Sequence, residues 1–265
     1  MKKKKKYGQH FLTNKQVIRE IVNYNDLTDI VVIEIGPGSG VLTEELAKIC
    51  KYVYAFEIDT DLKPYLDKIA NNYNNVEFLY KDILTVELDK FHFDNKIEFS
   101  ALVANIPYYI TAPILMLMLN TKQFETATIM MQKEVGERIS STSGKSYNDL
   151  SVLLQTYFNV NKVKTVSKKH FNPPPKVDSI ILNFSRKNDY LKLIKNEDNY
   201  KEFIRVSFAQ KRKTFLNNLT EGFGLDKSVV LEKILKINPL FNPLTRAENM
   251  TINDFILYSN GWYND

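Results

Sequence analysis

VVIEIGPGSGVLTEEL, residues 31–46, joins a run of β-branched residues to an amphipathic helical pattern through three glycines. We expect residues 31–35 to form a buried strand and residues 41–50 to form a helix. Gly36, Gly38 and Gly40 suit a place where the backbone turns sharply and a ligand lies against it. Their spacing is G-x-G-x-G, so on its own it fits both a nucleotide-binding loop and an ordinary tight turn.

Outward from this stretch, β-rich runs alternate with helical patterns over the first two thirds of the chain, as in a doubly wound α/β sheet. The expected strands are residues 31–35, 52–58, 76–80, 101–105 and 126–131. The expected helices between them are residues 41–50, 61–71 and 112–119. Two later runs, residues 156–166 and 176–184, resemble an antiparallel strand pair at a sheet edge. The predicted fold class is therefore α/β, with a Rossmann-like sheet.

The alternation of strand and helix patterns ends at about Arg186. Residues 198–219 and 227–237 have helical periodicity, and no clear strand pattern follows. We therefore expect two domains. Residues 1–186 form the Rossmann-like domain with a basic N-terminal arm, and residues 187–265 form a small all-helical domain.

Polar residues follow the ends of successive strands. Glu57 comes 21 residues after Gly36, where a nucleotide fold places an acid that accepts hydrogen bonds from ribose hydroxyls. Asp82 follows the third strand, where an acid can accept from an adenine amino group. Each acid alone fits a surface position equally well, but together they indicate an adenosine ligand. The loop lacks the Lys-Ser/Thr of a triphosphate loop, so S-adenosylmethionine fits best.

The segment Asn105-Ile106-Pro107-Tyr108 follows the fourth strand and belongs to the same crevice. Asn105 offers a neutral acceptor, and Pro107 biases Ile106 toward an extended backbone that can aim its carbonyl into the site. Two neutral acceptors suit an exocyclic amino group, and Tyr108 can stack on its ring. The alternative is that these residues form only a turn between a strand and a helix.

The charge is unevenly distributed. Lys2–Lys6 carry as many positive charges as the whole chain's net charge of +5, so the remainder sums to zero. Residues 161–187 nevertheless hold seven Lys/Arg against one acid, and residues 201–216 hold five against one. Such clusters favour a polyanion as partner, although a solvated arm or helix face has the same composition.

Several classes of protein are disfavoured. One cysteine and three scattered histidines give no disulfide and no expected metal site. No apolar run is long enough to span a membrane, and no signal-peptide core or transit peptide is visible. We therefore expect a cytoplasmic protein.

Eight segments of the chain resemble a known family: YGQHFLTN (7–14), EIGPGSGVLT (34–43), FEID (56–59), NIPYYIT (105–111), MMQKEVGERI (130–139), FNPPPKVDS (171–179), QKRKTFLNNL (210–219) and RAENMT (246–251). The family is the ribosomal RNA adenine N6,N6-dimethyltransferases. The chain is most similar to the branch that dimethylates two adjacent adenosines near the 3′ end of 16S rRNA in the 30S subunit.

The resemblance implies roles for individual residues, with S-adenosylmethionine as cofactor and a monomeric enzyme. The expected cofactor contacts are His10, Leu12, Gly36, Gly38, Glu57, Ile58, Asp82, Ile83 and Asn105. The expected catalytic group is Asn105, Ile106, Pro107, Tyr108 and Phe171, with Tyr108 and Phe171 sandwiching the target adenine. The expected RNA-binding residues are Lys168, Lys169, Lys211, Arg212 and Lys213. The family usually has Asn at the positions of His10 and Tyr109.

Other functions stay open at this point. A sister branch methylates 23S rRNA and confers macrolide resistance, and a third possibility is a mainly non-catalytic 30S assembly factor. A DNA adenine methyltransferase fits less well, because its motif resembles Asp-Pro-Pro-Tyr. QKEVGERI, PPPKVDS and RAEN favour the 16S branch.

Overall fold

The computed structural model describes residues 10–264, so the basic arm Lys2–Lys6 lies outside the described residues. The described residues form two compact units, one of residues 10–136 and 160–186 and the other of residues 137–159 and 187–264. The expected boundary after Arg186 is one junction between these units. Residues 137–159, which we assigned to the first domain, pack instead with the helical unit.

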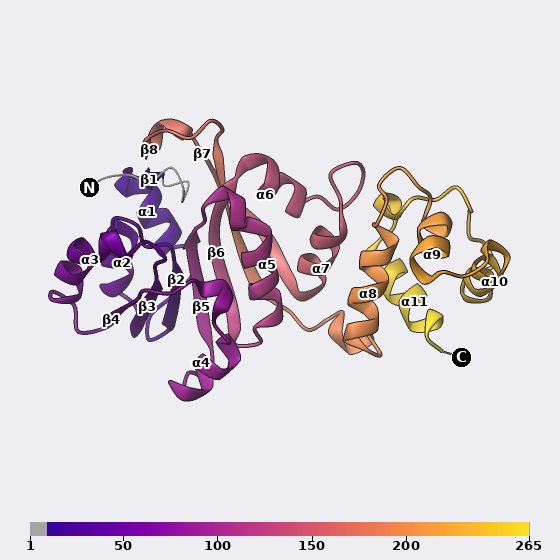
Figure 1. The fold of residues 1–265 in the computed structure, drawn as a ribbon, viewed down its shortest axis with the longest axis horizontal. Helices are drawn as coiled ribbons and strands as arrows, with labels where there is room; N and C mark the ends of the chain where they lie inside the picture. The colour runs from indigo at the N-terminus through magenta and orange to yellow at the C-terminus, as the bar shows by residue number, and fades with distance from the viewer. Residues whose placement is uncertain (1–9, 265) are drawn as a thin grey trace. The chain divides into compact units, whose positions relative to one another are not determined.

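The first unit is built on a seven-stranded sheet of order β4-β3-β2-β5-β6-β9-β7 (Figure 1). Its strands are β2 (Val31–Ile35), β3 (Tyr52–Phe56), β4 (Val76–Leu79), β5 (Ser100–Asn105), β6 (Phe124–Gln132), β7 (Phe158–Val166) and β9 (Ser179–Arg186). The ladders from β4 through β6 are parallel, and β9 runs antiparallel to β6. A separate pair, β1 (Phe11–Leu12) and β8 (Phe171–Asn172), is also antiparallel.

The strand order reverses between β2 and β5. From β2 the chain continues outward to β3 and β4, whereas β5 and β6 extend the sheet on the other side of β2. The two central strands are in register, so Ile35 lies opposite Ala104, and the next residues, Gly36 and Asn105, lie close together at the ends of the two strands. Ligands of open α/β sheets bind at such a reversal, outside the carboxyl ends of the strands.

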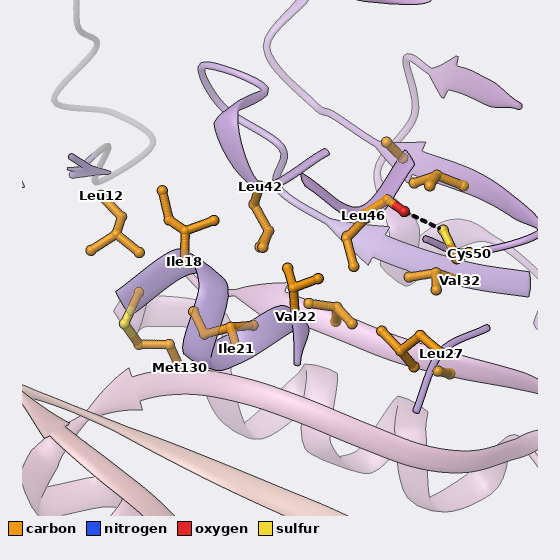
Figure 2. Close-up of a cluster of buried hydrophobic side chains, with 14 of the residues drawn as sticks. Leu12, Ile18, Ile21, Val22, Leu27, Val32, Leu42, Leu46, Cys50 and Met130 are labelled. Atoms are coloured by element: carbon orange, nitrogen blue, oxygen red, sulfur yellow. Dashed lines mark hydrogen bonds between the residues drawn. The ribbon is translucent and has the colours of Figure 1, made fainter. Parts of the chain in front are cut away.

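Helices precede, connect and follow the parallel strands of the sheet. They are α1 (Lys15–Val22), α2 (Val41–Ala47), α3 (Lys63–Ala70), α4 (Leu88–Asp94), α5 (Thr111–Asn120) and α6 (Lys133–Ile139). Figure 2 shows Ile18, Ile21 and Val22 of α1 within the buried cluster that includes residues of α2 and β2. In the same cluster the Cys50 thiol donates to the Leu46 carbonyl at 2.8 Å. Leu12 of β1 reaches this core as well, so the core anchors the segment that precedes α1.

The second unit is helical. Its helices are α7 (Asp149–Tyr157), α8 (Glu197–Ser207), α9 (Phe215–Phe223), α10 (Lys227–Ile237) and α11 (Ile252–Trp262). Aromatic rings form its core: Phe203 lies 5.9 Å from Phe215 and 5.8 Å from Trp262 between ring centroids. Among the described residues after Arg186 there is no strand, as the sequence predicts.

The α/β class with a Rossmann-like sheet and a helical C-terminal part is confirmed. The strand expected over residues 156–166 begins only at Phe158, because Thr156 and Tyr157 end helix α7. The helix expected over residues 41–50 ends at Ala47. No described helix has the length and apolarity needed to cross a bilayer.

Candidate active site

A cavity of about 400 Å³ opens at the carboxyl ends of the central strands. It is lined by all 13 residues expected to be catalytic or to contact the cofactor: His10, Leu12, Gly36, Gly38, Glu57, Ile58, Asp82, Ile83, Asn105, Ile106, Pro107, Tyr108 and Phe171. These residues come from segments that are up to 161 positions apart in the sequence. The fold therefore gathers the whole predicted set into one site, while their individual roles stay predictions.

The glycine loop forms the floor of this cavity. Gly36, Gly38 and Gly40 all have positive φ, between 58° and 78°, which disfavours any other residue. A Cβ on Gly38 would lie 2.8 Å from the Phe11 ring, and one on Gly40 would lie 2.1 Å from Ile69. Glycine is therefore required at these two positions both by the backbone conformation and by the close approach of Phe11 and Ile69.

Glu57 ties this loop to the next strand end. One carboxylate oxygen accepts from the Gly38 N–H at 3.1 Å, and the other accepts from the Asp59 N–H at 2.8 Å. Burial raises the pKa of Glu57, and these backbone donors oppose the shift. Each carboxylate oxygen can accept a further hydrogen bond, so Glu57 can still bind ribose hydroxyls.

Asp82 follows β4, the third parallel strand along the chain. Its Oδ1 accepts from the Leu84 N–H at 3.0 Å, which begins a short 3₁₀ turn at Ile83. The other carboxylate oxygen remains for a ligand amino group, as expected. Two hydrogen-bond-accepting acids, a glycine loop and apolar walls fit an adenosyl cofactor with a non-phosphate tail.

The segment from Asn105 to Tyr108 forms the wall beside the cofactor region. Ile106 extends the ladder beyond β5, because its N–H donates to the Met130 carbonyl at 3.1 Å. Pro107 has φ −57°, and the next residues form the 3₁₀ turn η4 (Tyr108–Ile110). The hydroxyl of half-buried Tyr108 lies 3.0 Å from the Ser179 hydroxyl. Burial raises the pKa of Tyr108, so its hydroxyl keeps its proton at neutral pH.

Residues 10–14, which we call the strap, are fastened to residues 168–175, which we call the lip. Strand β1 of the strap pairs with β8 of the lip. The backbone N–H and the hydroxyl of Thr13 both donate to the His170 carbonyl at 2.9 Å. The Asn14 amide contacts the His170 ring at 2.9 Å. This pairing places Phe171 at the wall of the cavity, where it is 5% exposed and also packs within the hydrophobic core cluster. Its role in sandwiching the adenine stays a prediction.

His10 connects the strap, the lip and Tyr108. Its Nδ1 lies 2.8 Å from the Pro173 carbonyl, which can only accept, so Nδ1 carries the proton. Its ring is stacked against Tyr108 at a centroid distance of 6.2 Å. His10 thus lines the cavity although the family usually has Asn there. Tyr109 also lines it and is 58% exposed, so it lies at the mouth rather than in the core.

Sequence reasoning missed Glu34. This acid lies within β2, two residues before Gly36, and is completely buried. Burial raises the pKa of Glu34 to about 8; the nearby Glu57 charge adds to the shift and the Thr43 hydroxyl opposes it. The available signal was an acid inside an otherwise apolar strand.

The predicted RNA-binding lysines lie in two places. Lys168 and Lys169 are exposed on the lip, in the 3₁₀ turn η5 (Lys168–His170). Lys211 and Lys213 line a second cavity, of about 250 Å³, wholly within the helical unit. Arg212 is exposed but does not line it.

The second cavity contains cations that the prediction omitted. Arg138, Lys145 and Arg246 join Lys211 and Lys213, so five cationic side chains face two acids, Asp149 and Glu248. Asn218 holds the loop between α8 and α9 in place, since its amide donates to the Ser207 carbonyl at 2.7 Å. Among residues 10–264 no cluster of His, Cys, Asp and Glu has the makings of a metal site.

The model of the ribosomal RNA adenine dimethylase family matches residues 1–258. A ribosomal RNA small subunit methyltransferase A from Onion yellows phytoplasma is 40% identical over 264 residues, covering 98% of this chain and 96% of that protein. The protein of that name from Latilactobacillus sakei is 40% identical over 95% of this chain and 87% of its own length.

Two solved structures are similar along almost the whole chain. A dimethyladenosine transferase from Plasmodium falciparum has a TM-score of 0.79 at 26% identity, covering 94% of this chain and 96% of that one. A 23S rRNA methyltransferase has a TM-score of 0.72 at 25% identity, covering 95% and 98%. The resemblance read from eight short motifs is thereby confirmed. The chain belongs to the ribosomal RNA adenine dimethylase family, and it is an S-adenosylmethionine-dependent rRNA adenine dimethyltransferase.

Proposed function

We propose that this enzyme dimethylates N6 of two adjacent adenosines near the 3′ end of 16S rRNA, within the 30S subunit. The observation that carries the proposal is the single cavity in which the glycine loop meets Asn105, Tyr108 and Phe171. The choice of subunit is supported by relatives at about 40% identity that are named small subunit methyltransferases. The 23S methyltransferase is more distant, at 25% identity.

One group of the lining residues binds the cofactor, and another group binds the target adenine. Gly36, Gly38, Glu57 and Asp82 hold the adenosyl part of the cofactor, and the strap covers it from above with His10 and Leu12. Ile58 and Ile83 provide apolar walls around its adenine ring. When bound, S-adenosylmethionine supplies a methyl group activated by its positively charged sulfur.

The second ligand is the target adenine. Tyr108 and Phe171 sandwich its ring, and each stacking contact with a base is worth roughly 1–3 kcal/mol. The Asn105 side chain and the Ile106 carbonyl accept its two N6–H hydrogens. These contacts draw the nitrogen lone pair out of conjugation and aim it at the methyl group. No strong base is needed, because the alkylated nitrogen is acidic and loses its proton to water. Positioning and local electrostatics therefore supply the catalysis.

The cationic side chains bind the rest of the RNA. Lys168 and Lys169 on the lip reach phosphates near the target base, and the second cavity, with Lys211 and Lys213, binds phosphates elsewhere in the subunit. Arg212 adds to the same basic surface. We infer a monomeric enzyme, as the resemblance to the family implies. It works in the cytoplasm, where ribosomal subunits are assembled.

The assignment is tested by incubating the purified protein with labelled S-adenosylmethionine and unmethylated 30S or 50S subunits, then mapping the label by nuclease digestion. We expect label on two adjacent 16S adenosines and none on 23S rRNA. Label confined to 23S rRNA would assign the enzyme to the resistance branch. Tight 30S binding without any label would favour an assembly factor that does not methylate.

A further inference from the structure

Ser179 is the only residue in contact with the Tyr108 hydroxyl among the hydrogen bonds of the described residues. The two side-chain oxygens are 3.0 Å apart. Ser179 is 1% exposed and does not line the cavity, whereas Tyr108 is half-buried and does. The serine therefore contacts the hydroxyl end of the tyrosine from outside the cavity.

The position of Ser179 is fixed independently of Tyr108. Ser179 begins β9 and pairs with Gln132 across the β6–β9 ladder. The preceding residue, Asp178, is held at two points: its carbonyl accepts from the Lys133 N–H and its carboxylate accepts from the Lys168 N–H, both at 3.0 Å. A hydroxyl on such a rigid element is a fixed anchor for a ring that projects into a cavity.

Tyr108 needs such an anchor. It lies in the short turn η4, and among residues 10–264 its ring has one stacked neighbour, His10, at a centroid distance of 6.2 Å. A tyrosine side chain whose hydroxyl makes no hydrogen bond can rotate about two side-chain bonds. Each rotation lowers the fraction of molecules in which the ring has the orientation that stacking on a base requires.

We propose that Ser179 is a positioning residue for methyl transfer: through its hydrogen bond it holds the Tyr108 ring at the angle at which the target adenine stacks. The proposal rests on the base-stacking role of Tyr108. It adds a function to Ser179, which never touches the substrate. The second methylation depends most on this angle, because the N6-methyladenine ring must be seated again with a bulkier amino group.

The test is a double-mutant cycle of Ser179→Ala, Tyr108→Phe and the double variant. A neutral hydrogen bond predicts that each single change lowers kcat/KM about fivefold and raises the fraction of monomethylated product. The double variant should be no worse than the poorer single variant, because both changes remove one interaction. Cofactor affinity should stay at the wild-type value.

Ser100→Ala is the matched control. Ser100 is also 1% exposed in the first unit, and its hydroxyl bonds to the His92 ring at 2.8 Å, away from the cavity. We expect a similar loss of thermal stability and unchanged kcat/KM and product ratio. Additive losses in the cycle, or a Ser179→Ala enzyme with wild-type kinetics, would overturn the proposal.

Two features of the design allow the test to decide even if a variant does not fold or the subunit assignment is wrong. If Ser179→Ala does not fold, Tyr108→Phe alone decides, since wild-type kinetics for that variant show that the hydroxyl contact is not used. All ratios are taken on whichever ribosomal subunit the wild-type enzyme methylates. A wrong assignment of the subunit therefore leaves the test of Ser179 intact.

Discussion

Glu34 is a buried acid whose protonation state differs between the folded and the unfolded chain. Its side chain is fully buried beneath the glycine loop, and burial raises its pKa from 4.5 to about 8. Between these two pH values the folded protein keeps a proton that the unfolded chain releases. The contribution of Glu34 to stability is therefore fully present below about pH 4.5 and is lost as the pH rises toward 8.

Replacing Glu34 with Gln removes this titration. We expect Glu34→Gln to have a higher melting temperature than the wild type at pH 8 and no such advantage at pH 5. The measurement is thermal unfolding of both proteins across this range. Parallel curves with a constant offset would mean that Glu34 does not titrate within it.

At the same scale, the sequence predicted several residues that line the cavity because they stand at or just after strand ends. Glu57, Asp82 and Asn105 each follow a β-rich run, and parallel strands end at one edge of the sheet. Ser179 was out of reach of that argument, since its contact with Tyr108 spans 71 positions and no local pattern encodes it.

At the scale of elements, the loop from β2 to α2 depends on glycine for two separable reasons. Gly36 and Gly40 both have positive φ, so alanine at either position costs about 1–2 kcal/mol in backbone strain. A Cβ at Gly36 would find ordinary contact, 3.7 Å from the Asn105 carbonyl oxygen. At Gly40 it would collide with Ile69 of α3, so Gly40→Ala should cost about 1–3 kcal/mol more than Gly36→Ala. Urea unfolding of the two variants measures this difference, and equal losses would refute the packing argument.

Helix α1 begins at a residue with two contacts. The Asn14 side chain accepts from the Gln16 and Val17 N–H groups, and its amide also contacts the His170 ring. Asn14→Ala should lose about 1 kcal/mol of stability, a typical value for a helix cap. Asn14→Ser keeps a capping oxygen but is too short to reach His170, so it should recover most of that loss. If serine is as damaging as alanine in denaturant unfolding, the link to the lip matters more than the cap.

The sequence predicted elements well where one local pattern dominates. Val31–Ile35 and Lys227–Ile237 have the expected bounds, because an apolar run and a helical period define them. The sequence analysis did not predict helix α7, because its apolar residues continue without a break into the following strand. Asn148, whose side-chain oxygen accepts from the Ser151 N–H, could have indicated the start of this helix. The β1–β8 pair was not predictable, as each strand has only two residues.

At the scale of the whole molecule, the helical unit is expected to contribute electrostatic affinity for rRNA. The double variant Lys211→Ala/Arg246→Ala removes two cations from its cavity. We expect weaker 30S binding, and the slope of log K against log salt should become shallower by about one to two units. Lys192→Ala, an exposed lysine of the same unit outside the cavity, is the control. If the double variant has the wild-type slope of log K against log salt, the cations of this cavity do not bind RNA phosphates.

The division into units was the least predictable feature at this scale. The change to helical periodicity after Arg186 was visible, but the assignment of residues 137–159 depends on contacts formed only after folding. Tyr147 and Phe208 illustrate this: their rings meet edge to face at 6.1 Å, 61 positions apart.

The most direct test of the account compares Asn105→Ala with the wild type on unmethylated 30S subunits at saturating S-adenosylmethionine. Turnover is measured as N6-methylated and N6,N6-dimethylated adenosine by mass spectrometry, and 30S affinity is measured in parallel. We predict a loss of turnover of about 100-fold or more with 30S affinity retained, because Asn105 orients the reacting amine while the lip and the helical unit hold the RNA. Turnover within about twofold of the wild type would contradict the central claim that Asn105 aims the adenine amine in this cavity.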